Sequence, residues 1–171
     1  MYKNTDLFQN ALRPSDIQPL RTVLFALMMG VAIFYGVIGF LYSNTPPTPN
    51  EDVSLIRYLS YLHIVLFGSM WLIRPLLFVK MMAQAAKVPP ESAIAPIRTA
   101  FIVRAVLSES LALFGGVICL LAATSGVLEA HPVYWLNMLS GFIFIWNTYQ
   151  EMPDEFRLTV LYQEYVAPYC G

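Results

Sequence analysis

The sequence predicts an all-α integral membrane protein, a bundle of four helices that cross a bilayer. Two observations predict this fold. The 171 residues are 57% hydrophobic and only 12% charged, which is about half the charged fraction of an ordinary soluble domain. Four apolar runs are each long enough to cross a bilayer core of about 30 Å, which takes roughly 20 helical residues. Because a backbone in hydrocarbon must satisfy its own hydrogen bonds, each run is expected to be a helix.

The four expected spans are, in chain order, residues 21–43, 56–79, 97–125 and 132–150. Their connections, SNTPPTPNED, AAKVPPESAIAP and EAHP, are rich in the residues that favour turns. The last connection is so short that the third and fourth spans must form a tight antiparallel hairpin. For residues 151–171 the sequence predicts a short amphipathic helix that lies at the cytoplasmic surface. A frayed polar tail is the alternative. The whole chain is expected to form one transmembrane domain.

Basic residues predict the orientation, because cytoplasmic loops of membrane proteins carry an excess of lysine and arginine. Eight of the ten basic residues lie before the first span, around the loop between the second and third, and after the fourth: Lys3, Arg13, Arg21, Arg74, Lys80, Lys87, Arg98 and Arg157. Arg104 lies inside the third span, and the other two loops have only Arg57 at their edge and are otherwise acidic. Both termini are therefore expected in the cytoplasm. With a net charge of −1 the chain has no excess of basic residues to neutralise phosphates, so a nucleic-acid partner is not expected.

Two short stretches occur twice in the chain. IQPLRT at 17–22 is similar to IAPIRT at 94–99, and FYGVIGFL at 34–41 is similar to LFGGVICL at 113–120. The offset changes from 77 to 79 residues, so the alignment needs a small insertion. The pattern indicates a duplicated helical hairpin with parallel repeats. Chance similarity between two apolar helices is the alternative.

Glu109 stands inside the apolar third span. It lies about 18 Å from the cytoplasmic start of that span at 1.5 Å per residue, past the midplane. A carboxylate that faces lipid there costs roughly 2.5–3.5 kcal/mol, so Glu109 is expected to face the bundle, to be paired or to be protonated. His63 lies at a similar depth in the second span and is the expected partner; Asn137 and Ser140 are further options. Glu109 is then either a packing residue that fixes helix register or an ion or proton site.

Small residues mark two helix faces. Ala105, Ala112 and Gly116 share a face with Glu109 in the third span, and Ala32, Gly36 and Gly39 line the first span. Small residues let two helix backbones approach closely in a membrane. Both faces are therefore expected to pack against another helix, in this chain or in a neighbouring one.

The segment LSESLALFGGVI, residues 107–118, resembles the ion-binding helix of rotary ATPase subunit c. The resemblance implies that Glu109 matches the ion-binding carboxylate and that Gly115 matches a glycine six residues later. It covers about one helix of four. The partner helix in subunit c is rich in glycine, whereas the second span here has only Gly68, and the basic polar-loop motif is missing. A ring of such subunits is therefore not expected.

Two longer segments, RTAFIVRAVLSESLALFGGVICLLA at 98–122 and MPDEFRLTVLYQEY at 152–165, are similar to a set of small bacterial four-helix membrane proteins without assigned function. This resemblance implies the four-span architecture and the bacterial plasma (inner) membrane, with several passes. It implies no activity. Such proteins often carry glycine after the glutamate, where this chain has Ser110.

The sequence contains no glycine-rich phosphate loop, zinc-ligand spacing or nucleophile motif. We therefore expect no enzyme activity, no metal site and no cofactor. The expected function is that of a non-catalytic accessory or structural subunit in a larger membrane assembly. Its partners would be the lipid bilayer and other membrane protein chains, or a second copy. The alternative is a small proton- or ion-coupled carrier with Glu109, together with His63, as the titrating site.

Overall fold

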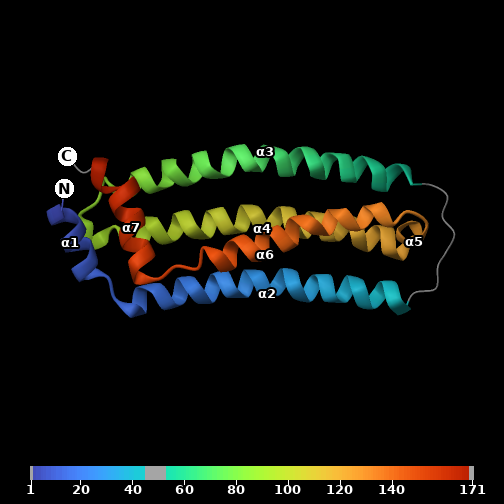
Figure 1. The fold of residues 1–171 in the computed structure, drawn as a ribbon, viewed down its shortest axis with the longest axis horizontal. Coiled ribbons are helices and arrows are strands. Elements are labelled where there is room, and N and C mark those ends of the chain that lie inside the picture. The colour runs from blue at the N-terminus through green and yellow to red at the C-terminus, as the bar shows by residue number, and fades with distance from the viewer. Residues whose placement is uncertain (1, 45–52, 170–171) are drawn as a thin grey trace.

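The computed structural model describes residues 2–44 and 53–169, and helices make up nearly all of this part of the chain, with no strand in it. Figure 1 shows the arrangement. The helices in chain order are α1 (Tyr2–Ala11), α2 (Pro14–Asn44), α3 (Ser54–Ala85), the short η1 (Pro90–Ser92), α4 (Ile94–Thr124), α5 (Val127–Ala130), the 3₁₀ helix η2 (Pro132–Met138), α6 (Leu139–Gln150), α7 (Glu155–Tyr165) and η3 (Ala167–Tyr169).

In the described part of the chain, three helical segments are long and apolar enough to cross a membrane: α2, α3 and η1–α4. Their length follows from the apolar composition, since a helix satisfies every backbone hydrogen bond internally. Proline does not end α3, as the residues around Pro75 remain helical and the helix continues to Ala85. Phe78, Met82 and Ala85 are buried after the proline, so packing at this end keeps the helix intact.

The expected fourth span is not one continuous α-helix. Residues 132–138 form the 3₁₀ helix η2, and only the 12 residues of α6 are α-helical. Side chains stabilise the change of winding, because Asn137 Nδ2 donates to Tyr134 O at 2.9 Å and Ser140 Oγ donates to Asn137 O at 3.1 Å. Short 3₁₀ stretches are common at the start of α-helices. The fourth segment is therefore helical throughout but divided in two.

Helix α4 occupies the centre of the bundle, and α2, α3 and α6 all pack against it. Figure 1 shows α2 and α3 on opposite sides of α4. The second half of the chain does form a packed pair, because α6 returns along α4. Since α2 and α3 make their main contacts with α4, the two halves do not form two equivalent hairpins. The expected hairpin duplication is therefore wrong as a description of the packing.

Helices α1 and α7 lie together at one end of the bundle, which we call the terminal end (Figure 1). The rings of Phe8 and Tyr162 stack with their centroids 4.3 Å apart, and both side chains are fully buried. Helix α7 begins after Asp154, whose Oδ1 accepts a hydrogen bond from Arg157 N at 2.7 Å. An aspartate at this position is a favoured N-cap. Helix α1 was not predicted from the sequence, because its residues include no long apolar run.

Candidate functional site

Glu109 lies on the side of α4 that faces α2. A Cβ added to Gly30 would lie 3.8 Å from Glu109 Oε1. The carboxyl group is half-buried, and within the described residues it makes no hydrogen bond or ion pair. The predicted contact with His63 is wrong, because His63 lies on α3 and α3 packs on the opposite side of α4 from α2.

His63 instead belongs to a buried polar cluster with Asn137 and Ser60. His63 Nδ1 lies 3.0 Å from Asn137 Oδ1, and Asn137 Nδ2 donates to Ser60 Oγ at 3.0 Å. Because both N–H groups of the amide already donate, to Ser60 and to Tyr134 O, its oxygen faces the ring and Nδ1 carries the proton. His63 Nε2 is buried and has no partner in the described part of the chain. Asn137 and Ser140 were expected near Glu109 but lie on this side of α4.

Gly115 is the point where four elements meet. A Cβ at this position would lie 2.1 Å from the backbone oxygen of Asn137, 2.7 Å from Cε1 of His63 and 2.9 Å from Ser140 Oγ. Only a residue without a side chain permits this approach. The resemblance to subunit c singled out Gly115 as part of an ion-binding helix. In this fold its role is to let α3, η2 and α6 close around α4.

The small residues of α4 do form a packing face. Ala105, Ala112 and Gly116 are buried, and a Cβ on Gly116 would lie 2.7 Å from the ring of Phe34 on α2. The hydroxyl of Tyr35 donates to Ala112 O at 3.0 Å across the same contact. This face therefore holds α2 against α4 within one chain.

In the described part of the chain, Gly36 and Gly39 of α2 do not pack against another helix. Ala32 and Gly36 are exposed and Gly39 is half-buried. A Cβ at Gly36 or at Gly39 would meet no atom within 4 Å. Helix α2 packs instead through Leu24, Val31, Ile38 and other large apolar residues on its opposite face.

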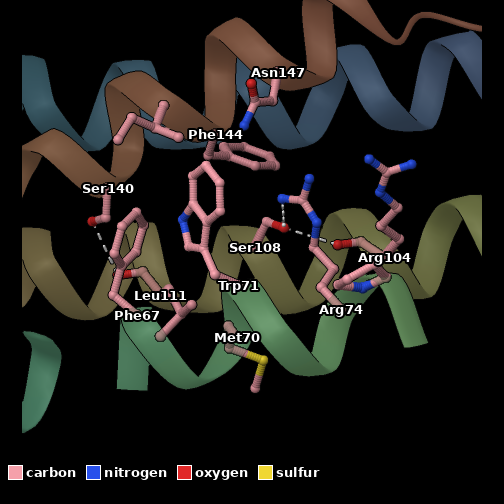
Figure 2. A pocket seen from close by; sticks show the side chains of 12 residues that line it. Phe67, Met70, Trp71, Arg74, Arg104, Ser108, Leu111, Ser140, Phe144 and Asn147 are labelled. Carbon is pink, nitrogen blue, oxygen red and sulfur yellow. Dashed lines mark hydrogen bonds between the residues drawn. The ribbon is translucent and has the colours of Figure 1, made fainter. Parts of the chain in front are cut away.

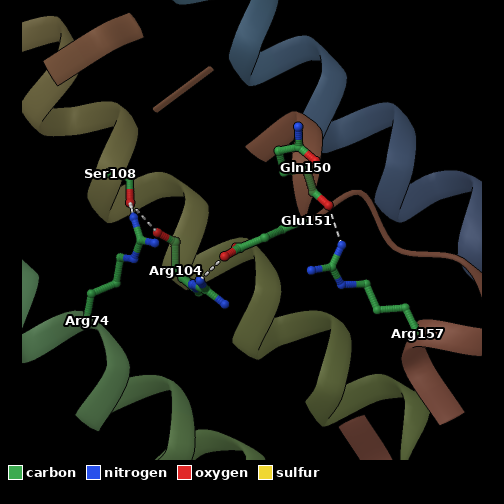
Figure 3. A network of polar contacts seen from close by, with 6 residues as sticks. All are labelled: Arg74, Arg104, Ser108, Gln150, Glu151 and Arg157. Carbon is green, nitrogen blue, oxygen red and sulfur yellow. Dashed lines mark hydrogen bonds and ion pairs between the residues drawn. The ribbon is translucent and has the colours of Figure 1, made fainter. Parts of the chain in front are cut away.

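A charged cluster lies between α3, α4 and the end of α6 (Figure 3). Arg104 pairs with Glu151, and its guanidinium carbon lies 4.9 Å from the centre of the Phe78 ring. Arg74 Nη1 donates to Ser108 Oγ at 2.9 Å. Within the described residues, no carboxylate lies within ion-pair distance of Arg74. Arg74, Arg104 and Glu151 together supply two guanidinium groups and one carboxylate; Figure 3 also shows Arg157 of α7, whose Nη1 donates to the backbone oxygen of Gln150.

A cavity of about 230 Å³ opens beside this cluster. Figure 2 shows Arg74, Ser108 and Asn147 around it, with Phe67, Trp71 and Phe144 forming apolar walls. A neighbouring cavity of about 460 Å³ shares Phe67 and Ser140 with the first and reaches His63 and Arg57. This site was not predicted from the sequence. The signal was present, since Arg74 and Arg104 are arginines inside apolar runs and residues of this kind are usually functional in membrane helices.

Within the described residues, no group of three or more histidine, cysteine, aspartate or glutamate side chains could hold a metal ion. The chain matches no protein-family model, no curated protein and no solved structure. The similarity of residues 107–118 to subunit c therefore stays a prediction, and the site must be interpreted from its own geometry.

Proposed function

We propose that the chain is a multi-pass protein of the bacterial plasma membrane with both termini in the cytoplasm, and that η2 and α6 together make the fourth crossing. At about 2.0 Å per 3₁₀ residue and 1.5 Å per α residue, the two elements span about 32 Å. This matches a hydrocarbon core of about 30 Å. Figure 1 shows the start of α2, the end of α3, the start of α4 and helix α7 at the terminal end. The sequence of these segments and of their connections includes Arg13, Arg21, Lys87, Arg98 and Arg157, in keeping with the excess of basic residues on cytoplasmic loops.

We infer that its function is that of a non-catalytic accessory subunit that associates with other membrane chains or with itself. The observation that carries this proposal is Glu109, a half-buried carboxyl group on a membrane-spanning helix without a partner in the described chain. Facing lipid, such a group costs roughly 2.5–3.5 kcal/mol. A hydrogen-bond donor from a neighbouring chain offsets that cost. Polar side chains commonly join helices in membranes in this way.

A second surface also favours association. Ala32, one of the exposed small residues of α2, borders a groove of about 530 Å³ against α6, which is also lined by Phe25, Met29, Phe142 and Trp146. A helix from another chain can approach closely over small residues. This groove lies beside α6, whereas Glu109 lies near Gly30 on the other flank of α2. The chain therefore offers two separate contacts.

The test is extraction of the tagged protein from its native membrane in a mild detergent, followed by measurement of the particle mass and identification of co-purifying chains. We expect a stoichiometric complex for the wild type. Glu109→Leu, which keeps the volume and removes the hydrogen-bonding group, should lose it. Glu129→Leu is the matched control, because it makes the same change at an exposed glutamate at the opposite end of the bundle. A wild-type protein that runs as a lone monomer would contradict the proposal.

The same carboxyl group supports a second candidate, a small proton- or ion-coupled carrier with Glu109 as the titrating site. His63 has no part in this version, because it bonds to Asn137. The proposal predicts pH-dependent reaction of Glu109 with a hydrophobic carbodiimide. It also predicts that Glu109→Gln abolishes transport while the fold stays intact. Normal transport by that variant would remove the carrier hypothesis and leave the accessory role.

A further inference from the structure

We propose that the cavity between α3, α4 and α6 binds an anionic phospholipid, with its phosphate on Arg74 and one acyl chain along the groove beside α3. The inference rests on the membrane placement proposed above. It does not depend on association with other chains, and it does not use the Glu109 side chain. Three features of the cavity carry it: its unbalanced charge, its shape and its depth.

The charge around the cavity is unbalanced. Glu151 neutralises Arg104, and the ring of Phe78 holds the Arg104 guanidinium in place. Arg74 donates one of its five N–H groups to Ser108 Oγ and has no carboxylate partner among the described residues. A guanidinium group in an apolar surrounding is stabilised by an anion, and phosphate oxygens match its planar arrangement of donors. Asn147 reaches toward the same space from α6 (Figure 2).

The shape of the cavity suits a hydrocarbon chain. Trp71 lines it and is 64% exposed, so the cavity opens at the apolar side of the bundle, where lipid would lie. The second cavity continues from Phe67 along α3 and is bordered by Ile64 and Leu136, which are also exposed. From Arg74 to Ile64 the helix rises about 15 Å. That is half of a core of about 30 Å, the depth of one leaflet.

The depth of Arg74 matches a headgroup position. Exposed apolar residues cover α3 from Leu55 onward, and Arg74 lies about 29 Å along the helix from Leu55. A core of about 30 Å that begins near Leu55 therefore ends near Arg74. Beyond this level one face of α3 is buried at the terminal end through Phe78 and Met82, while Leu76 and Val79 on its outer face remain exposed. A phosphate at Arg74 would then lie at the cytoplasmic boundary of the hydrocarbon.

The experiment uses the full chain in detergent with Trp135 and Trp146 replaced by phenylalanine, so that Trp71 is the only reporter. Its fluorescence is titrated with dibrominated phosphatidylglycerol and, separately, with dibrominated phosphatidylcholine, because bromine quenches tryptophan on contact. Both lipids carry a phosphate, but the choline ammonium of phosphatidylcholine cancels the net charge of its headgroup and is repelled by Arg74 and Arg104. We therefore expect half-quenching at an about tenfold lower concentration of the anionic lipid. Arg74→Gln should remove the preference. Lys80→Gln, which removes the same charge from an exposed position on α3, should keep it.

Equal quenching of the wild-type reporter by the two lipids would overturn the proposal, and this comparison needs no variant at Arg74 to fold. An unchanged preference in Arg74→Gln would also overturn it. Inorganic phosphate is the third probe: if it displaces the anionic lipid at equal concentration, the site is one for a free anion and not for a lipid. The assay uses the isolated chain, so its result is independent of whether partner chains co-purify.

Discussion

Replacing Gly115 with alanine tests the central packing of the bundle. The new Cβ would lie 2.1 Å from the backbone oxygen of Asn137 and 2.7 Å from Cε1 of His63. Real Cβ atoms do not approach this closely, and the nearest atom belongs to the backbone, so η2 must move away from α4. Overpacking of a core costs about 1–3 kcal/mol, and a backbone obstacle places this change in the upper half of that range, about 2–3 kcal/mol.

Alanine also favours a helix over glycine by about 0.5–1 kcal/mol. The net loss in free energy of unfolding is then about 1–2.5 kcal/mol, which lowers the melting temperature by roughly 2–10 °C for a chain of this size. Thermal unfolding in detergent, followed by circular dichroism, measures the shift. The matched control is Gly68→Ala on α3, where an added Cβ meets no atom within 4 Å.

The control should be as stable as the wild type or slightly more stable. The reasoning is refuted if Gly115→Ala melts at or above the wild-type temperature. It is also refuted if both alanine variants lose the same stability, because the loss would then not come from the junction at Gly115.

Two further substitutions probe other parts of the fold. Phe8→Ala removes a fully buried ring that stacks on Tyr162, so we expect the free energy of unfolding to fall by about 3–5 kcal/mol. Helix α1 should also be cleaved by a protease faster than in the wild type. Cleavage of α1 at the wild-type rate would contradict the packing of α1 on α7. Asn137→Leu leaves the buried side chains of His63 and Ser60 without their shared hydrogen-bond partner. The free energy of unfolding should therefore fall by about 1–3 kcal/mol in the thermal unfolding assay. An unchanged stability would show that this polar cluster does not stabilise η2.

The sequence is sufficient to predict the long helices, because apolar length alone decides whether a segment can cross a bilayer. It does not predict where they end. Helix α3 passes Pro75 and continues to Ala85, because Phe78 and Met82 are buried in the core at the terminal end, which also contains Phe8 and Tyr162. That core also explains why α1 is helical although it is too polar to span a membrane: Phe8 is buried there against α7.

The site could be predicted only in part, because depth along a helix does not tell which neighbour lies on which side. Glu109 and His63 were paired on depth. Glu109 and Gly115 are about 120° apart around α4 at 100° per residue, and Gly115 faces His63 while Glu109 faces α2. The predicted depth of Glu109 was counted from residue 97, and Ile97 and Phe101 are buried at the terminal end. The depth itself stays a prediction.

The two proposed sites lie on different faces of α4, and a double variant tests whether they are independent. Ser108, which binds Arg74, and Glu109 are neighbours in sequence but about 100° apart around the helix. Effects at sites that share no partner usually add. The double variant Arg74→Gln with Glu109→Leu should therefore lose as much preference for the anionic lipid as Arg74→Gln alone. It should also lose as much association with other chains as Glu109→Leu alone. Recovery of lipid preference in the double variant, or loss of it in Glu109→Leu alone, would mean that both groups serve one site reaching around α4.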